Sequence, residues 1–182
     1  MGVEIRGLDR LQRKSALVPR LARKAAINAT NEVTDTVYGH AVENAQRRFL
    51  HPTGETVGSL KTEVVENSEG SIVGRLFSDK KTSFFTEFGT GKVGQESNAY
   101  IPPNFSFSYT QTPWFFPTSY TDRDLALLYG MKVITIQGVD FYWTRGQKAR
   151  PWMRPALISG SEDAPEIYER HVKQQLRELR NK

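Results

Sequence analysis

The sequence contains no cysteine, so a disulfide framework, a thiolate nucleophile and every cysteine-ligated metal site are excluded. Its three histidines, His40, His51 and His171, leave little material for metal binding or acid–base chemistry. No stretch approaches the roughly 18 to 20 apolar residues that span a bilayer, and residues 1–10 lack the apolar core of a secretory signal. These absences predict a soluble, intracellular protein that makes no contact with a membrane.

What is present suffices for a folded domain. Hydrophobic residues make up 38% of the 182 residues and charged residues 25%, as in an ordinary globular protein. The length predicts a single domain over residues 1–182. A net charge of +5 permits an acidic partner without requiring one.

The chain shows no catalytic motif: the G-x-S-x-G string of hydrolases is absent, and the carboxylates are dispersed. The string Gly89-Thr90-Gly91-Lys92-Val93-Gly94 matches the dinucleotide-binding pattern G-x-G-x-x-G, which requires a preceding strand and a helix that opens at its last glycine. Because the residues after it lack helical periodicity, we interpret the string as a glycine turn, with a nucleotide-binding enzyme as the rival interpretation. The sequence therefore predicts that the protein is not an enzyme and binds no metal or cofactor.

Both ends of the chain have helical patterns. From residue 18 onward, small and apolar side chains recur every three or four positions and predict a long helix over 19–49, which His51-Pro52 would end. Residues 1–18 would form a separate basic arm or helix. The long helix would measure about 46 Å, against about 30 Å for a small domain, so part of it would pack outside its own core.

The C-terminal part contains three shorter helical patterns. Asp122–Tyr129 is one, with Thr121 as its predicted N-cap. Residues 155–157 form another, begun by a proline that suits a first turn. Asp163, with a glutamate three residues on, predicts the start of a separate final helix within 161–182.

Residues 50–160 contain two patterns of paired strands. Leu60–Val65 and Ile72–Phe77 form the first pair, separated by turn residues. Met131–Ile136 and Phe141–Thr144 form the second, separated by four residues. Together with the helices at the two ends, these pairs predict an α+β fold, in which a small antiparallel sheet of two hairpins packs with a long N-terminal helix and a C-terminal helix.

Between the hairpins, residues 97–121 contain no charged residue, four prolines and eight of the chain's 20 aromatic residues. Prolines at this density argue against a regular helix or a central strand. The segment is either a lid folded back on the core or a loop exposed for a partner, since interfaces use exposed aromatic surface. The suspected interface residues are Tyr100, Phe105, Phe107, Trp114, Phe115 and Phe116 in this segment, with Glu87 and Phe88 before it.

The sequence also contains two clusters of basic residues. Residues 1–24 hold seven lysines and arginines against two acidic residues, and residues 145–154 hold four with no acidic residue among them. As phosphate contacts they would support an alternative function, a nucleic-acid-binding protein that uses its basic N-terminal segment. The alternative is that these basic side chains are solvated charges on the surface of helices and loops and bind no partner. The candidate patch residues are Arg10, Arg13, Lys14, Arg20, Arg23, Lys24, Arg145, Lys148 and Arg150.

Four short strings occur in order between the long N-terminal helix and the C-terminal helix. They are Thr53-Gly54 with Ser59-Leu60, Phe85-Thr86-Glu87-Phe88-Gly89-Thr90-Gly91, Phe141-Tyr142-Trp143-Thr144-Arg145-Gly146-Gln147, and Arg150-Pro151-Trp152-Met153-Arg154-Pro155-Ala156-Leu157. In this order and spacing they resemble the tail-completion (head–tail joining, minor tail) proteins of long-tailed bacteriophages. The resemblance covers about residues 5 to 180 of the 182.

The resemblance implies a small α+β domain that assembles as a ring, a hexamer matched to the tail tube, where the tail meets the neck of the capsid. It implies a structural virion protein of the neck or tail top, assembled in the cytoplasm of the bacterial host. Its partners would be itself, the neck or head-completion proteins, and the tail-terminator or tail-tube proteins, with non-specific contact with DNA in the channel. In the second string, a carboxylate and an aromatic side chain would precede a tight turn whose glycines tolerate a positive φ. For these residues a role in the local fold is favoured over direct contact with a partner.

Overall fold

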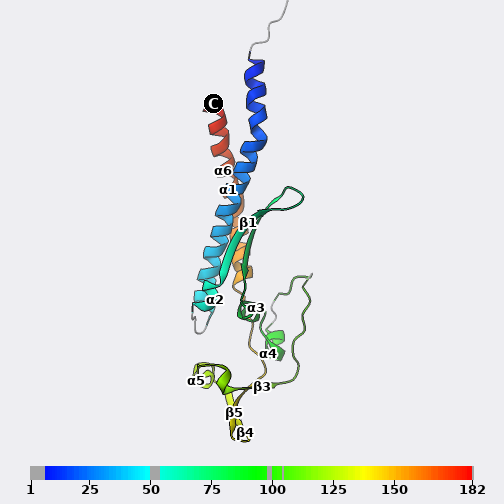
Figure 1. The fold of residues 1–182 in the computed structure, drawn as a ribbon, viewed down its shortest axis with the longest axis vertical. Helices are drawn as coiled ribbons and strands as arrows, with labels where there is room; N and C mark the ends of the chain where they lie inside the picture. The colour runs from blue at the N-terminus through cyan, green and yellow to red at the C-terminus, as the bar shows by residue number, and fades with distance from the viewer. Residues whose placement is uncertain (1–6, 50–53, 98–99, 104, 182) are drawn as a thin grey trace, which may run out of the picture. The chain divides into compact units, whose positions relative to one another are not determined.

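The structure is a computed structural model that describes residues 7–49, 54–97, 100–103 and 105–181. A long N-terminal helix packs against a C-terminal helix, and two small antiparallel sheets of two and three strands accompany them (Figure 1), so the predicted α+β class is confirmed. The helices are α1 (Leu8–Arg48), α2 (Glu55–Gly58), α3 (Lys81–Phe88), α4 (Gly91–Glu96), the 3₁₀ turn η1 (Thr118–Tyr120), α5 (Leu125–Tyr129) and α6 (Met153–Asn181). The strands are β1 (Leu60–Glu66), β2 (Ile72–Ser78), β3 (Trp114–Pro117), β4 (Lys132–Ile136) and β5 (Val139–Thr144).

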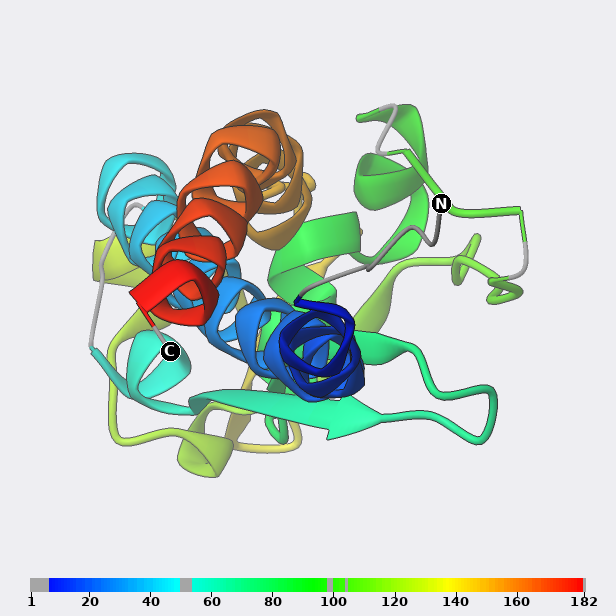
Figure 2. The ribbon, with the colours of Figure 1, turned by 90° about the horizontal axis from the view of Figure 1, so that it is seen from above.

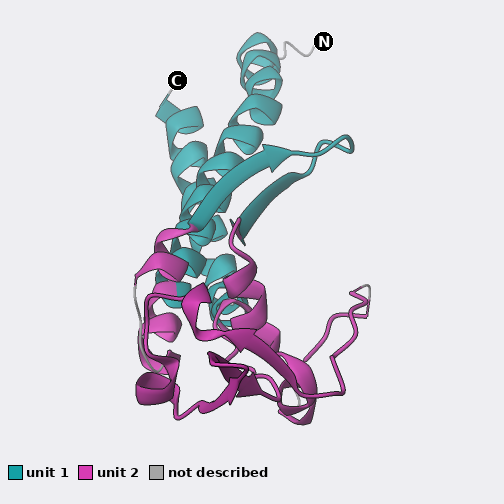
Figure 3. Ribbon diagram, turned by 60° about the horizontal axis from the view of Figure 1, so that its bottom comes forward, with its two compact units in different colours: residues 1–41, 60–77, 156–182 teal, residues 42–59, 78–155 magenta. Residues whose placement is uncertain are grey.

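The chain forms two compact units, coloured separately in Figure 3. Unit 1 comprises residues 1–41, 60–77 and 156–182, and unit 2 comprises residues 42–59 and 78–155. The prediction that residues 1–182 form one domain stays a prediction. Among the described residues, no helix is both long and apolar enough to cross a membrane.

In unit 1, α1 and α6 lie side by side (Figures 1 and 2). Alanines 25, 29 and 41 of α1 are buried, so its predicted small-residue seam faces the interior. Across the contact, the hydroxyl groups of Thr30 and Tyr168 are hydrogen-bonded at 2.6 Å. Gly160 of α6 lies so close to Val37 that a Cβ atom there would be 2.3 Å from Val37 Cγ2. Small residues on both helices therefore allow the close packing.

Both long helices contain a proline and continue through a predicted helix start. α1 continues from Leu8 through Pro19, so the separate helix or arm over 1–18 is wrong for its described part. α6 continues through Pro165, so the predicted helix start at Asp163 is wrong as well. Both prolines are exposed, and so are the residues four positions earlier, whose carbonyl groups lose a helical partner. Water can satisfy those carbonyl groups, which is why neither proline ends its helix.

Charged side chains link α1 and α6 at two levels. The carboxylate of Glu32 accepts hydrogen bonds from the guanidinium of Arg170 and, at 2.7 Å, pairs with the Nε2 of His171. The hydrogen bond with His171, and secondarily the one with Arg170, holds the pKa of Glu32 below its ordinary value. Eight residues along each helix, about two turns away, His40 Nε2 lies 3.5 Å from a carboxylate oxygen of Asp163. These pairs favour one register of the two helices.

The first predicted hairpin is confirmed as strands β1 and β2. β2 carries a glycine at the point where it meets α1: a Cβ atom on Gly74 would lie 2.1 Å from the hydroxyl oxygen of Thr34. Thr34 is itself buried and donates its hydroxyl to the carbonyl oxygen of Thr30 at 2.7 Å. The hairpin therefore packs against α1 through its backbone, a contact that strand periodicity does not reveal.

In unit 2, the second predicted hairpin is confirmed as β4 and β5 and is joined by β3 in the order β3-β5-β4. Its turn is shorter than predicted, because β5 begins at Val139. Gln137 and Gly138 have φ values of 51° and 80°, the left-handed pair of a two-residue hairpin turn. β3 lies at an edge of the sheet, where the proline that ends it removes no central hydrogen bond.

Helix α5 begins later than predicted, and its N-cap is Asp124 instead of Thr121. Asp124 Oδ1 accepts hydrogen bonds from the backbone N–H groups of Ala126 and Leu127 at 2.9 and 3.0 Å. Thr121 accepts only from the N–H group of Arg123, within the preceding turn. The predicted end of the long N-terminal helix at residues 51–52 lies outside the described residues.

The close approach of α1 and α6 predicts the effect of Gly160→Ala. The new methyl group would overlap Val37 Cγ2 at 2.3 Å, so the variant should lose about 1–3 kcal/mol of stability from overpacking. Gly39→Ala is the matched control, because a Cβ atom there meets nothing within 4 Å and alanine should gain about 0.5–1 kcal/mol in a helix. Urea unfolding measures both, and adding Val37→Ala to Gly160→Ala should restore part of the loss. A Gly160→Ala variant as stable as Gly39→Ala would contradict the described packing.

Candidate interaction site

The glycine turn is the centre of a tightly interlocked region in unit 2. The N–H group of Thr90 donates to the carbonyl oxygen of Gln147 at 3.0 Å, and the N–H group of Gln147 donates back to the carbonyl oxygen of Thr90 at 3.1 Å. A Cβ atom on Gly146 would lie 1.8 Å from the carbonyl oxygen of Thr90, and one on Gly91 would lie 2.3 Å from that of Arg145. Only glycine permits the two backbone segments to approach this closely.

The surroundings of the glycine string differ from those of a dinucleotide site. Helix α3 precedes the string, where the dinucleotide motif requires a strand. The predicted turn is present at Gly89 and Gly91, which have φ values of 76° and 60°. However, residues 91–96 form α4, so the prediction that no helix follows was wrong. A helix opens at Gly91, and the last glycine of the string, Gly94, lies inside it.

Glu87 is buried and satisfies the first backbone N–H groups of α6. Its Oε2 accepts from the N–H groups of Trp152 at 2.7 Å and Met153 at 2.9 Å, and its Oε1 accepts from that of Arg154 at 3.0 Å. A negative charge at a helix N-terminus also interacts favourably with the helix dipole. The carboxylate of Glu87 is thus used within the chain, which fits the favoured role in the local fold and not the suspected contact with a partner.

The residue that precedes α6 forms the core of this region. Trp152 is fully buried, and its ring packs edge-on against Phe49 with 5.3 Å between the ring centroids. Its carbonyl oxygen accepts a hydrogen bond from the side-chain amide of Asn44 at 3.2 Å. The fourth string of the sequence analysis thus supplies both a core side chain and the helix start that Glu87 caps.

Part of the aromatic segment folds back on α3. Phe107 lies edge-on to Phe84 with 5.1 Å between ring centroids, and Phe105 stacks on Phe88 at 5.8 Å. Tyr109 donates its hydroxyl to the carbonyl oxygen of Phe88 at 2.9 Å, and burial raises its pKa. These contacts correspond to the lid, although the side chain of Phe105 remains 48% exposed.

The remaining suspected interface residues are placed differently. Trp114, Phe115 and Phe116 belong to the edge strand β3, in which Trp114 and Phe116 are half-buried and Phe115 is 49% exposed. Tyr100 lies apart from them under the guanidinium of Arg154, which is 3.4 Å from the ring centroid. The structure therefore does not gather all suspected residues into one surface, and the choice between lid and partner loop differs along the segment.

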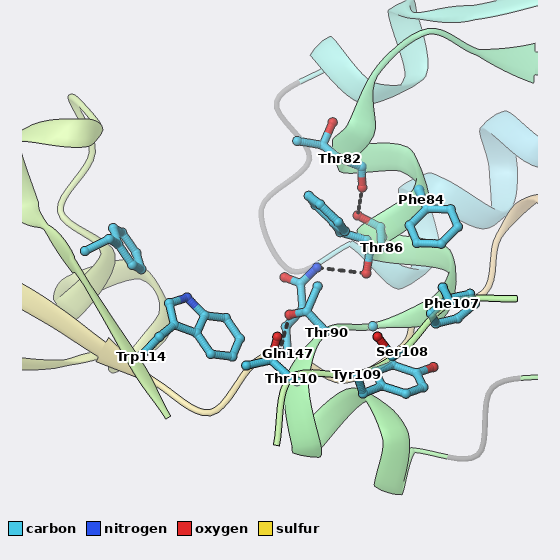
Figure 4. Close-up of a pocket in the computed structure, with 14 residues that line it drawn as sticks. Thr82, Phe84, Thr86, Thr90, Phe107, Ser108, Tyr109, Thr110, Trp114 and Gln147 are labelled. Atoms are coloured by element: carbon cyan, nitrogen blue, oxygen red, sulfur yellow. Dashed lines mark hydrogen bonds between the residues drawn. The ribbon is translucent and has the colours of Figure 1, made fainter. Parts of the chain in front are cut away.

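A groove of about 700 Å³ lies between α3, the glycine turn and β3 (Figure 4). Its walls include the aromatic side chains of Phe85, Tyr109 and Trp114, and its polar groups are uncharged, such as Thr86 and Gln147. The side-chain amide of Gln147 donates to the carbonyl oxygen of Phe85 at 2.9 Å, which ties one wall to another. Among the residues that the structure describes, no charged side chain lines the groove. It suits an uncharged, largely apolar ligand.

The sequence analysis missed this groove because it assigned no helix to residues 81–88. The period of the aromatic residues in α3, with Phe84 and Phe88 four positions apart, could have indicated one. The four-residue spacing places both rings on the same helix face, where the folded-back segment covers them. Phe85 lies one position on and, like Phe84, lines the groove.

The candidate basic residues fall into the two units. Those between positions 10 and 24 lie on α1, where Arg23 pairs with Glu66 and Lys24 lies 3.5 Å from Glu178. Lys14 donates to the carbonyl oxygen of Arg180 at 3.1 Å. Arg10, Arg13 and Arg20 are exposed and have no carboxylate partner among the described residues. Arg145, Lys148 and Arg150 lie in unit 2 beside the glycine turn.

No group of three or more metal-binding side chains is found in the described parts of the chain. Comparison with known proteins adds no relative: no protein-family model, curated protein or solved structure matches the chain.

Proposed function

We propose that the chain is a structural virion protein that completes the tail of a long-tailed bacteriophage and joins it to the head, acting as a ring-forming subunit and not as an enzyme. The observation that carries the proposal is that three of the four sequence strings that resemble the family are hydrogen-bonded to one another in the structure. Thr90 and Gln147, from the second and third strings, exchange backbone hydrogen bonds, and Glu87 of the second string caps the helix that the fourth string begins.

This contact between the strings supports the resemblance because it gives them a common physical reason. A carboxylate at position 87 is required by the N–H groups at 152–154, and glycine at position 146 is required by the carbonyl oxygen of Thr90. Strings whose residues require one another in this way belong to one structural unit. Their occurrence together and in this order is therefore stronger support for the resemblance than four separate short matches would be.

Exposed apolar surface supports the assembly role. Leu127 and Tyr120 are 82% and 78% exposed, and Phe115 and Phe105 are about half exposed. Single exposed apolar side chains are ordinary, but several large ones gathered in one region are typical of contacts between proteins. None of the described residues that line the groove beside β3 carries a charged group that could act as a catalytic acid or base, so the chemistry of the groove favours binding. We expect the partners to be further copies of the chain and the proteins of the neck and tail.

Deletion of the gene from the phage that encodes it tests the function. The mutant should package DNA and polymerise tail tubes, because the proposed role begins only when both parts exist. The lysate, examined by electron microscopy, should contain full heads together with separate tails or tails of irregular finish, and a plasmid copy of the gene should restore joined particles. Empty heads would indicate a packaging role, and normal infectious particles would exclude the joining role.

A nucleic-acid-binding function is the second candidate, favoured by the three exposed arginines of α1 that lack a carboxylate partner in the described chain. Weak, salt-dependent and non-specific DNA binding would fit both candidates, because a ring around a DNA channel would show it too. Tight binding to one sequence would favour this second function. A filter-binding or fluorescence-anisotropy assay over random and phage DNA separates the two.

A further inference from the structure

The most exposed large apolar side chains described lie on one small protrusion of unit 2, residues 118–129. Tyr120 ends η1 with 78% of its side chain exposed, and Leu127 lies within α5 with 82% exposed. An isolated exposed leucine is ordinary, but two large apolar groups this exposed in one twelve-residue segment are a candidate contact.

The backbone of the protrusion is held in place. Asp124 caps α5 by accepting hydrogen bonds from two N–H groups, one of them that of Leu127 at 3.0 Å. The N–H group of Leu125 donates to the hydroxyl of the buried Tyr142 at 3.0 Å, and Gly130 ends the helix in the left-handed conformation. Leu127 is therefore presented on an ordered element, so a partner that binds it does not have to order a loop first.

The groove beside β3 has matching chemistry. No residue of 118–129 lines it, so groove and protrusion are different surfaces of unit 2. Its aromatic walls would accept a leucine side chain, and the oxygens of Thr86 and Thr90 would accept a hydrogen bond from a phenolic hydroxyl. An uncharged lining also disfavours a charged side chain, which would lose its hydration there.

In the sequence, the exposed charged residues that flank the groove are mainly cationic and those of the protrusion mainly acidic; Glu87, which follows the groove residue Thr86, is buried at the start of α6. Lys81 precedes a groove residue, and Arg145 and Lys148 lie within two positions of Gln147. In the described part of the chain none of these three cations has a carboxylate partner. The protrusion carries two aspartates, Asp122 and Asp124, against one arginine. Such an arrangement speeds productive encounter and favours one orientation of the partner.

We propose that the groove binds the Tyr120–Leu127 protrusion of a second copy of this chain. The inference rests on the proposed ring-forming function and names the surfaces that would join neighbouring subunits. Because each copy presents its groove to one neighbour and its protrusion to another, the contact is heterologous. Repetition of a heterologous contact closes into a ring when its rotation permits, and an isologous contact would stop at a dimer.

Two variants and their mixture test the inference. Leu127→Glu places a charge on the protrusion, and Phe85→Glu, at a position 41% exposed, places one in the groove. Each should weaken self-association by about 30-fold or more, as expected for a central interface residue. Each variant alone should then sediment as a monomer at concentrations where the wild-type chain forms species larger than a dimer. Circular dichroism verifies folding, and Thr82→Glu serves as a second groove variant if Phe85→Glu fails to fold.

The mixture is decisive because each variant retains the surface that the other lacks. Equimolar Leu127→Glu and Phe85→Glu should form a 1:1 dimer and nothing larger, since only one intact groove and one intact protrusion meet. Leu127→Glu mixed with the double variant should stay monomeric, because neither chain then has an intact protrusion. A folded pair of single variants that does not associate on mixing overturns the inference.

Two other results overturn the inference and leave the proposed function to its own test. Single variants that associate like the wild type would show that other surfaces join the subunits, so that a ring could still form. If the wild-type chain stays monomeric up to millimolar concentration, the proposed contact between copies of the chain does not form. Neither result decides the deletion phenotype, in which separate heads and tails would still support the joining role.

Discussion

Replacement of Glu87 by alanine is expected to lower the free energy of unfolding by about 3–6 kcal/mol, which is a large part of the stability of an ordinary domain. The side chain is buried, and its two carboxylate oxygens accept three backbone N–H groups at the start of α6. Hydrogen bonds to a charged group contribute about 1.5–3 kcal/mol each, and water can replace only part of them at this site. The variant should therefore be largely unfolded under mild denaturing conditions.

Two further substitutions distinguish the loss of the hydrogen bonds that cap α6 from the loss of a glutamate side chain as such. Glu87→Gln keeps the size, but its amide nitrogen would face an N–H donor, so the loss should be intermediate, about 1–3 kcal/mol. Glu96→Ala removes an exposed carboxylate whose nearest described cation, Lys92, is 3.8 Å away, and it should change stability by less than about 0.5 kcal/mol. Thermal and urea unfolding measure all three. Equal stability of Glu87→Ala and Glu96→Ala would show that the cap contributes nothing.

The sequence predicts the elements whose pattern is local. Alternation located both hairpins, and the short helix predicted to end at Tyr129 does end there, as α5. The seam of small residues on α1 followed from its three-to-four-residue period, and four of its alanines are buried. In each case the residues that form the element are neighbours in the chain, so a pattern of neighbours contains the information.

The sequence fails where a residue's role depends on a distant segment. Glu87 and the N–H group of Trp152 are 65 positions apart, so no local cap pattern connects them. The sequence predicted helix starts at Pro19 and at Asp163, but α1 and α6 continue through Pro19 and Pro165, because the consequence of a missing N–H group depends on whether the orphaned carbonyl group is exposed. Exposure is a property of the packed structure, and the same limit applies to the groove, which combines residues from 82 to 147.

Replacement of Gly146 by alanine is expected to destabilise unit 2 by about 3–5 kcal/mol, because both the backbone conformation and the packing at this position exclude a side chain. Its φ value is 102°, and a Cβ atom would lie 1.8 Å from the carbonyl oxygen of Thr90 and 2.9 Å from Gly91 Cα. Those neighbours are backbone atoms that cannot rotate away. To admit the methyl group, the two segments must separate, which breaks the reciprocal hydrogen bonds of Thr90 and Gln147.

Gly138→Ala is the control that separates the steric overlap at position 146 from the cost of a positive φ value, which both positions share. Gly138 also has a positive φ, 80°, but a Cβ atom there meets nothing within 4 Å. Alanine at this position should cost only the left-handed conformation, about 1–2 kcal/mol. Gly146→Ala should therefore lower the free energy of unfolding more than Gly138→Ala does, and the difference measures the contribution of the contact between the second and third strings. Hydrogen exchange should show the amides of Thr90 and Gln147 protected in the control and exposed in Gly146→Ala. If the two variants are equally stable and equally protected, the strings do not depend on one another, and the main support for the proposed function is lost.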